Sequence, residues 1–148
     1  MVVKPIPEGY HSVTPYLIVK GAGGLLDFLK QAFGAEQRFR MDRPDGSVGH
    51  AEVTIGDSVV MLAEASEQWP VMPGSIHLYV EDCDDAYRRA IEAGATSLQE
   101  PENQFYGDRS GGVRDPFGNV WWIVTHVEDV PEEELAARAE AWAAQQPT

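Results

Sequence analysis

The spacing of apolar and polar residues predicts two kinds of element along this chain. Apolar and polar side chains alternate in several short stretches, as in half-buried β-strands, and elsewhere recur every three or four residues, as in amphipathic helices. The predicted strands are SVTPYLIV (12–19), AEQRFRMDR (35–43), VGHAEVTI (48–55), VVMLAEA (59–65), SIHLYV (75–80), ATSLQEPE (95–102) and VWWIVTHV (120–127). The predicted helices are LLDFLKQAF (25–33), DCDDAYRRAIEAG (82–94) and 131–144.

Glycine and proline mark the boundaries between these elements. GAGG (21–24) is expected to break the chain before the first helix, and Gly34 to end that helix. PDGS (44–47) predicts a hairpin turn, because glycine tolerates the positive φ that such turns need. DPFGN (115–119) predicts a second tight turn, leading directly into an apolar strand.

The order strand–helix–strand–strand–strand of the first half is expected to recur in the second, where GGVRD (111–115) leads into the DPFGN turn before the last strand. This predicts an α+β fold of two βαβββ modules. We place the modules at 10–70 and 71–130 within a single domain spanning 1–148. The segment 131–148 forms a C-terminal helix and tail that belongs to neither module. A helix covers one face of each curled mixed sheet, so the other faces are expected to surround a cavity, a natural ligand pocket.

Composition excludes several classes of function. The net charge is −13, with 11 Lys and Arg against 24 Asp and Glu, which argues against a nucleic-acid or anionic-membrane partner. No apolar run reaches the roughly 20 residues of a membrane span. The N-terminus does not read as a signal peptide and there is one cysteine, which together favour the cytoplasm. No P-loop, G-x-G-x-x-G or G-x-S-x-G motif indicates a nucleotide cofactor or a serine nucleophile.

Strand alternation assigns the candidate side chains to faces. Trp121 and Trp122 must point to opposite faces of their strand, so one of them can enter the core while the other faces away from it. His50 and Glu52 share a face, while Ala51, Val53 and Ile55 form the apolar face. His50 and Glu52 are therefore expected to face the cavity, opposite His77 and Tyr79.

Four stretches resemble the vicinal-oxygen-chelate superfamily, also called glyoxalase/bleomycin resistance protein/dioxygenase proteins. They are TPYLIV…LLDFLKQAFGA, HAEVTIGDSVVMLAEA, HLYVEDCDDAYRRAIEAGA and YGDRSGGVRDPFGNVWWIVTHVEDV. Within the superfamily they look most like the PhnB-like branch. The resemblance implies paired βαβββ modules and a homodimer, but no single reaction, because fold and function separate widely.

The resemblance also implies where a divalent metal would bind. The four ligand positions of the superfamily's enzymes fall on Thr14, Leu62, His77 and Trp122, and of these only His77 is a metal ligand. An indole N–H only donates, so Trp122 replaces a ligand at the cavity. Glu64 could substitute for Leu62 only in a different register.

Three readings of the function follow. The first is a metal-free protein that binds a small, aromatic or antibiotic-like molecule, with no cofactor. Its expected ligand-binding residues are Tyr16, His50, Glu52, His77, Tyr79, Tyr106, Arg109 and Trp122. The second is a metal-dependent lyase, isomerase or dioxygenase that uses His77 with His50, Glu52 or Glu64; the third is a non-catalytic interaction protein.

Arg109 has two possible roles, and Cys83 has one expected state. Arg109 either binds an anionic ligand group from a mouth loop or braces that loop through a carboxylate. Cys83 lies at an acidic helix start, where negative charge disfavours the thiolate, and is expected to be inert.

Overall fold

The computed structural model describes residues 2–147, which form two four-stranded sheets and three helices. The first module comprises β1 (Tyr16–Val19), α1 (Ala22–Phe33), β2 (Glu36–Asp42), β3 (Val48–Ile55) and β4 (Ser58–Glu64). The second comprises β5 (Ser75–Tyr79), α2 (Cys83–Glu92), β6 (Thr96–Asn103), β7 (Asp108–Arg114) and β8 (Val120–His126). The last helix is α3 (Glu132–Gln145).

Both sheets have the same mixed topology. The first sheet has the order β1-β4-β3-β2 and the second β5-β8-β7-β6. β1 pairs in parallel with β4, and β5 pairs in parallel with β8. All other strand pairs are antiparallel. The predicted α+β fold of two βαβββ modules is confirmed.

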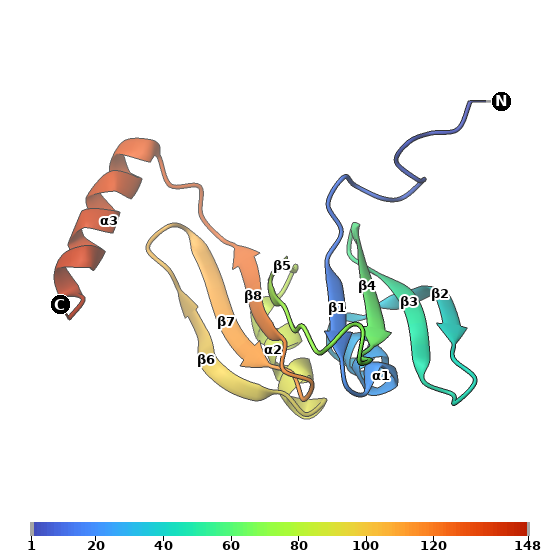
Figure 1. The fold of residues 1–148 in the computed structure, drawn as a ribbon. Helices are drawn as coiled ribbons and strands as arrows, with labels where there is room; N and C mark the ends of the chain where they lie inside the picture. The colour runs from blue at the N-terminus through green and yellow to red at the C-terminus, as the bar shows by residue number, and fades with distance from the viewer. Residues whose placement is uncertain (1, 148) are drawn as a thin grey trace.

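One hydrophobic core joins the two modules. α1 packs against α2 behind the sheets (Figure 1). Trp121 is fully buried, and its ring lies 5.0 Å from that of Phe33 on α1, so a strand of the second module packs on the helix of the first. Ala51, Val53 and Ile55 are buried as their alternation predicts. Removing apolar surface from water on this scale is the main force that holds the modules together.

The sheets do not close around a common cavity within one chain, which corrects the expected enclosure. They lie side by side, and the face of each sheet that points away from the helices, here called its open face, remains accessible (Figure 1). On the open faces Phe39 and Tyr79 expose 49% and 59% of their surface. A single chain therefore presents two separate open faces.

The GAGG stretch does not break the chain, because α1 already begins at Ala22. Gly21 precedes the helix with φ +87°, and Glu64 on β4 accepts hydrogen bonds from the backbone N–H groups of Gly21 and Ala22. A Cβ on Gly24 would lie only 2.7 Å from the ring of Phe117, which belongs to the second module. The glycines thus let the DPFGN turn pack on the first turn of α1.

The C-terminal helix α3 stands apart from both sheets and buries none of its residues (Figure 1). Arg138 ties it to the rest of the chain, with its guanidinium 2.7 Å from Glu128 and donating to the carbonyl of Phe105. The Trp142 and Phe105 rings lie 5.4 Å apart. No helix in the described part of the chain is long and apolar enough to cross a membrane.

Candidate functional site

The open face of the first sheet carries a hydrogen-bonded row of three predicted site residues. Tyr16 comes from β1, while His50 and Glu52 come from β3. The Tyr16 hydroxyl lies 3.0 Å from His50 Nδ1, and His50 Nε2 lies 2.8 Å from Glu52 Oε2. The side chains of His50 and Glu52 are 22% and 17% exposed, so the row is partly shielded from water. His50 and Glu52 share a face as the strand alternation predicted, and the strand order β1-β4-β3 brings Tyr16 to them.

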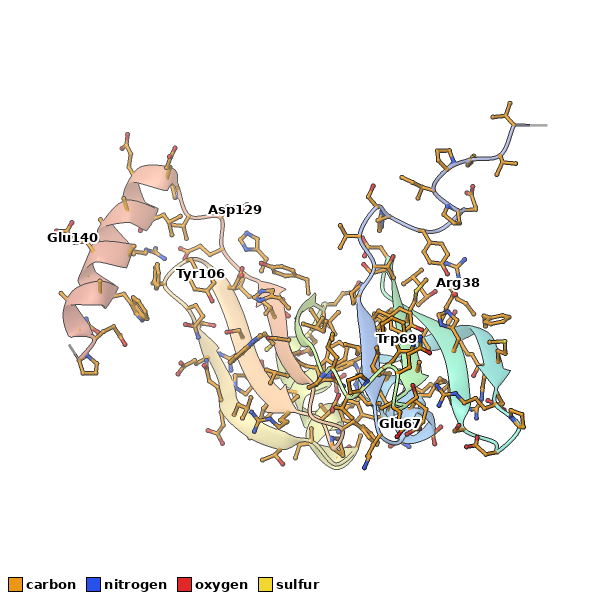
Figure 2. All side chains as sticks on the ribbon, viewed as in Figure 1. Arg38, Glu67, Trp69, Tyr106, Asp129 and Glu140 are labelled. Carbon is orange, nitrogen blue, oxygen red and sulfur yellow. The ribbon has the colours of Figure 1, made fainter. Side chains whose placement is uncertain are left out.

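A hollow of about 450 Å³ adjoins this row. Its lining consists of Tyr16, Ile18, Arg43, Gly49, Ala63, Glu64 and Trp69. Trp69, on the loop after β4, is 61% exposed (Figure 2). The hollow therefore combines exposed aromatic surface with one guanidinium group.

A second hollow, of about 220 Å³, lies on the open face of the second sheet. Its lining consists of His77, Gln99, Gln104, Tyr106, Ser110 and Trp122. His77 on β5 and Trp122 on β8 are direct neighbours across parallel strands. Tyr106 reaches the hollow from the loop between β6 and β7 (Figure 2). Three more of the predicted site residues, His77, Tyr106 and Trp122, thus meet at one place although they are 16 positions or more apart in the sequence.

Gln104 supplies a polar group that sequence reasoning missed. Its side-chain nitrogen is buried and has no hydrogen-bond partner among the described residues. Buried donors are almost always paired, because an unpaired one costs about 1–3 kcal/mol. A ligand with an acceptor atom in this hollow would satisfy it.

Gly112 makes room for the Trp122 ring. The two residues are paired across β7 and β8, and a Cβ on Gly112 would lie 2.5 Å from the ring. The indole therefore lies directly over the backbone of β7. This fixes the ring as one wall of the hollow.

Tyr79 belongs to a different cluster, at the end of the second sheet. Its hydroxyl donates to Asp108 Oδ2 at 2.9 Å, and Asp108 Oδ1 lies 2.8 Å from His126 Nδ1. The other ring nitrogen of His126 lies 2.7 Å from Asp129. Asp108 is only 5% exposed, and its hydrogen bond raises the pKa of Tyr79. His126 therefore joins the two carboxylates of this cluster.

His126 is expected to titrate above its ordinary pKa of 6.5, because hydrogen bonds to Asp108 first, and to Asp129 next, favour the imidazolium. A raised folded pKa gives stability that is complete below the unfolded pKa and lost as pH rises through the folded one. NMR titration of the imidazole should show the raised pKa, and Asp129→Asn should lower it. An unchanged pKa in that variant would mean that Asp129 does not contact the ring in solution.

Arg109 does not face a ligand site. It lies on β7 rather than on a loop, and its guanidinium donates two hydrogen bonds to Asp84 at 2.8 and 2.9 Å, tying β7 to α2. The guanidinium holds the pKa of Asp84 below its usual range. Of the two alternatives, the brace through a carboxylate is correct, and Arg109 is removed from the ligand-binding set.

Cys83 lies at the start of α2, buried, with its thiol donating to the carbonyl of Ile123. Burial is the first cause that raises the pKa of this thiol, and the charge of Asp84 is the second. A thiol kept protonated in this way is a poor nucleophile.

Comparisons with known proteins agree with this architecture. The profile of the Glyoxalase/Bleomycin resistance protein/Dioxygenase superfamily matches residues 10–123. The chain belongs to this superfamily. Uncharacterised proteins of Mycobacterium bovis and Mycobacterium tuberculosis H37Rv are each 36% identical to it over 137 residues, 85% of this chain and 90% and 81% of theirs.

Solved structures of the superfamily's fold superimpose on it as well. TioX from Micromonospora sp. ML1 matches with a TM-score of 0.68 at 24% identity, over 79% of this chain and 99% of TioX. A glyoxalase/bleomycin resistance protein/dioxygenase family enzyme from Burkholderia phytofirmans PsJN matches with a TM-score of 0.65 at 19% identity. The match covers 77% of this chain and 97% of that enzyme. At these identities the likeness concerns the fold.

The positions implied for a superfamily metal do not fit one here. Leu62 is fully buried on the helix side of β4, so the open face at this strand presents Met61 and Ala63 instead. Within residues 2–147 no group of three or more His, Cys, Asp and Glu side chains is arranged to hold a metal ion. A thioether, a methyl group and an indole offer no hard ligand for a divalent cation.

The second set of possible metal ligands, His77 with His50, Glu52 or Glu64, is divided between the two sheets. Glu64 caps α1, and both its oxygens accept backbone N–H groups there. His50 and Glu52 lie on the first sheet, whereas His77 lies on the second. Within one chain, His77 therefore does not lie on the same sheet as His50, Glu52 or Glu64.

Proposed function

We propose that this chain binds a small planar molecule, without a metal ion, in the hollow beside Trp122. The main support for this proposal is the side-chain nitrogen of Gln104, a buried donor that has no hydrogen-bond acceptor among the described residues. Trp122 and Tyr106 supply aromatic faces for stacking, and His77 supplies a second polar group. An aromatic ring with one carbonyl or ring-nitrogen acceptor matches this set.

A second copy of the chain is part of the same proposal. A hollow of about 220 Å³ is below the roughly 300–1,000 Å³ typical of ligand pockets, so one chain would hold only part of a drug-sized ligand. Phe39, Met41, Tyr79 and Leu98 all leave more than two fifths of their surface exposed. A homodimer that places open faces opposite each other would cover such side chains and deepen the hollow.

The branch and the compartment also stay proposals. YGDRSGGVRDPFGN followed by tryptophan supports the PhnB-like branch. A single buried cysteine supports the cytoplasm, where thiols stay reduced.

Ligand binding is tested with a library of aromatic carbonyl and aza-aromatic compounds, screened by thermal shift. Compounds that bind the folded state are expected to raise the Tm of the wild-type protein. Their Kd, measured by calorimetry, should rise about tenfold in Gln104→Leu, the cost of one hydrogen bond to a buried group. The Kd should rise further in Trp122→Ala, which removes the stacking surface.

Trp69→Ala is the matched control, because it removes an exposed tryptophan from the loop after β4, outside the lining of this hollow. It should leave the Kd unchanged, and sedimentation velocity on the same samples is expected to give a dimer. If no compound in the library raises the Tm, or if both tryptophan variants bind alike, the hollow is not a ligand site. The third reading, a non-catalytic interaction protein, would then replace it.

A further inference from the structure

Tyr16, His50 and Glu52 form a chain of three groups, each of which can pass a proton. Glu52 ends the chain on one side, 2.8 Å from His50 Nε2, and the Tyr16 hydroxyl ends it on the other, 3.0 Å from Nδ1. An ionised carboxylate only accepts hydrogen bonds, so Nε2 carries a proton and donates it to Glu52. In the neutral imidazole the lone pair of Nδ1 then points at the Tyr16 oxygen and accepts its O–H.

This order of groups matches the logic of a carboxylate–imidazole–hydroxyl triad. The carboxylate fixes the tautomer of the imidazole and stabilises the imidazolium that forms when the imidazole takes a proton. The imidazole is then the base that activates the hydroxyl. Here the hydroxyl is phenolic. It belongs to Tyr16, a residue that exposes 45% of its surface to small molecules in solution.

The hollow beside Tyr16 indicates which ligands would reach the hydroxyl. Arg43 lines it, and its guanidinium donates to the carbonyl oxygen of Glu64 but forms no ion pair with the carboxylates of residues 2–147. Both oxygens of the Glu64 carboxylate are used by the start of α1. The hollow therefore holds one guanidinium and one carboxylate, but Glu64 is already hydrogen-bonded to the backbone, whereas the guanidinium uses only one of its N–H donors within residues 2–147. The other donors can bind an anion such as a carboxylate. Trp69 adds a flat apolar surface.

We propose that Glu52, His50 and Tyr16 form a metal-independent proton relay that makes the Tyr16 oxygen reactive toward a small aromatic or apolar carboxylate bound between Trp69 and Arg43. When the Tyr16 oxygen takes a proton from the bound molecule or bonds to one of its electrophilic atoms, its own proton passes to His50 Nδ1. This leaves an imidazolium beside Glu52.

This site is separate from the hollow beside Trp122. Its residues belong to the first sheet, whereas those of the proposed ligand site belong to the second. Either proposal can therefore fail while the other stands.

The relay is tested through the reactivity of Tyr16 with p-nitrophenyl acetate. The Tyr16 oxygen attacks the acetyl carbonyl, p-nitrophenolate leaves, and the phenolic proton goes to His50. Mass spectrometry of digested protein measures the acetylation rate of each tyrosine. Tyr16 is expected to react at least tenfold faster than Tyr106, a control phenol of similar exposure at 39%.

The variants separate a relay from mere exposure. His50→Gln should slow acetylation of Tyr16 about tenfold or more, Glu52→Gln should slow it less, and neither should change Tyr106. Circular dichroism checks that each variant is folded.

Phenylacetate tests the ligand class in the same assay. It should protect Tyr16 from acetylation in the wild-type protein and protect it much less in Arg43→Gln. If Tyr16 reacts no faster than Tyr106, or equally fast in folded His50→Gln, there is no relay. If phenylacetate gives no protection, the assignment of a carboxylate ligand is wrong.

Discussion

Replacement of Asp115 by alanine is expected to lower the free energy of unfolding by about 3–5 kcal/mol. Asp115 opens the DPFGN turn and is only 3% exposed. Its Oδ1 accepts the backbone N–H groups of Phe117 and Asn119, at 2.8 and 3.0 Å. Its Oδ2 accepts the Asn119 side-chain amide and the Trp121 indole N–H, both at 2.9 Å. Alanine would leave four donors without their acceptor.

The size of this loss follows from what the donors hold in place. Asn119 and Trp121 are both fully buried, so water cannot replace the carboxylate without opening the core. Trp121 packs on Phe33, so the loss also loosens the contact between modules. Urea denaturation measures the loss directly, as a lower midpoint at an unchanged slope.

Two variants calibrate the measurement on Asp115. Asp115→Asn keeps one acceptor oxygen but turns an amide toward a donor, so its loss should lie between those of wild type and alanine. Asp45→Ala removes an exposed turn carboxylate that accepts from Ser47, and its effect should be far smaller because water replaces the carboxylate. Equal losses for Asp115→Ala and Asp45→Ala would show that Asp115 is an ordinary turn residue.

The elements and their faces could be predicted because each depends on neighbouring residues. Alternation places Trp121 and Trp122 on opposite faces, and the resemblance, which puts Trp122 at a ligand position of the cavity, leaves Trp121 for the core. The structure agrees, with Trp121 fully buried and Trp122 beside His77. The same rule assigned Ala51 and His50 to opposite faces of β3. A period of two needs no knowledge of distant segments.

Features that depend on contacts between distant segments could not be predicted from the sequence. GAGG has the composition of a chain break, yet it starts a helix because Glu64 caps it and Phe117 covers it. The hydrogen bond between Tyr16 and His50 likewise depends on the strand order β1-β4-β3, which places the two strands on either side of β4. Local patterns contain neither contact.

The Asp108–His126 pair could have been found from the sequence. DPFGN closes a hairpin in which Asp115 N–H donates to the carbonyl of Asn119. Each step back from Asp115 is matched by a step forward from Asn119, so Asp108 lies opposite His126, as the register of β7 and β8 has it. Following the hairpin from its turn would have placed the acid beside the imidazole.

Replacement of Gly107 by alanine is expected to lower the free energy of unfolding by about 2–4 kcal/mol, the sum of backbone strain and overpacking. Gly107 has φ +98°, a conformation that side chains disfavour. A Cβ there would overlap the carbonyl oxygen of Glu128 and approach the Val130 side chain to 3.1 Å. The Gly107 carbonyl also accepts the backbone N–H groups of Val127 and Glu128, so the glycine holds the segment that leads to α3.

Gly46→Ala separates the two causes of that loss. Gly46 has a similar φ, +86°, but nothing lies within 4 Å of the place where its Cβ would be. Its loss should therefore contain the backbone strain alone, about 1–2 kcal/mol. Hydrogen exchange should also show faster exchange at Val127 and Glu128 in Gly107→Ala only, because displacing the Glu128 carbonyl breaks the hydrogen bonds to residue 107. Equal losses in both variants, with protection at Val127 retained, would mean that the segment before α3 can move aside without cost and that Gly107 does not anchor it.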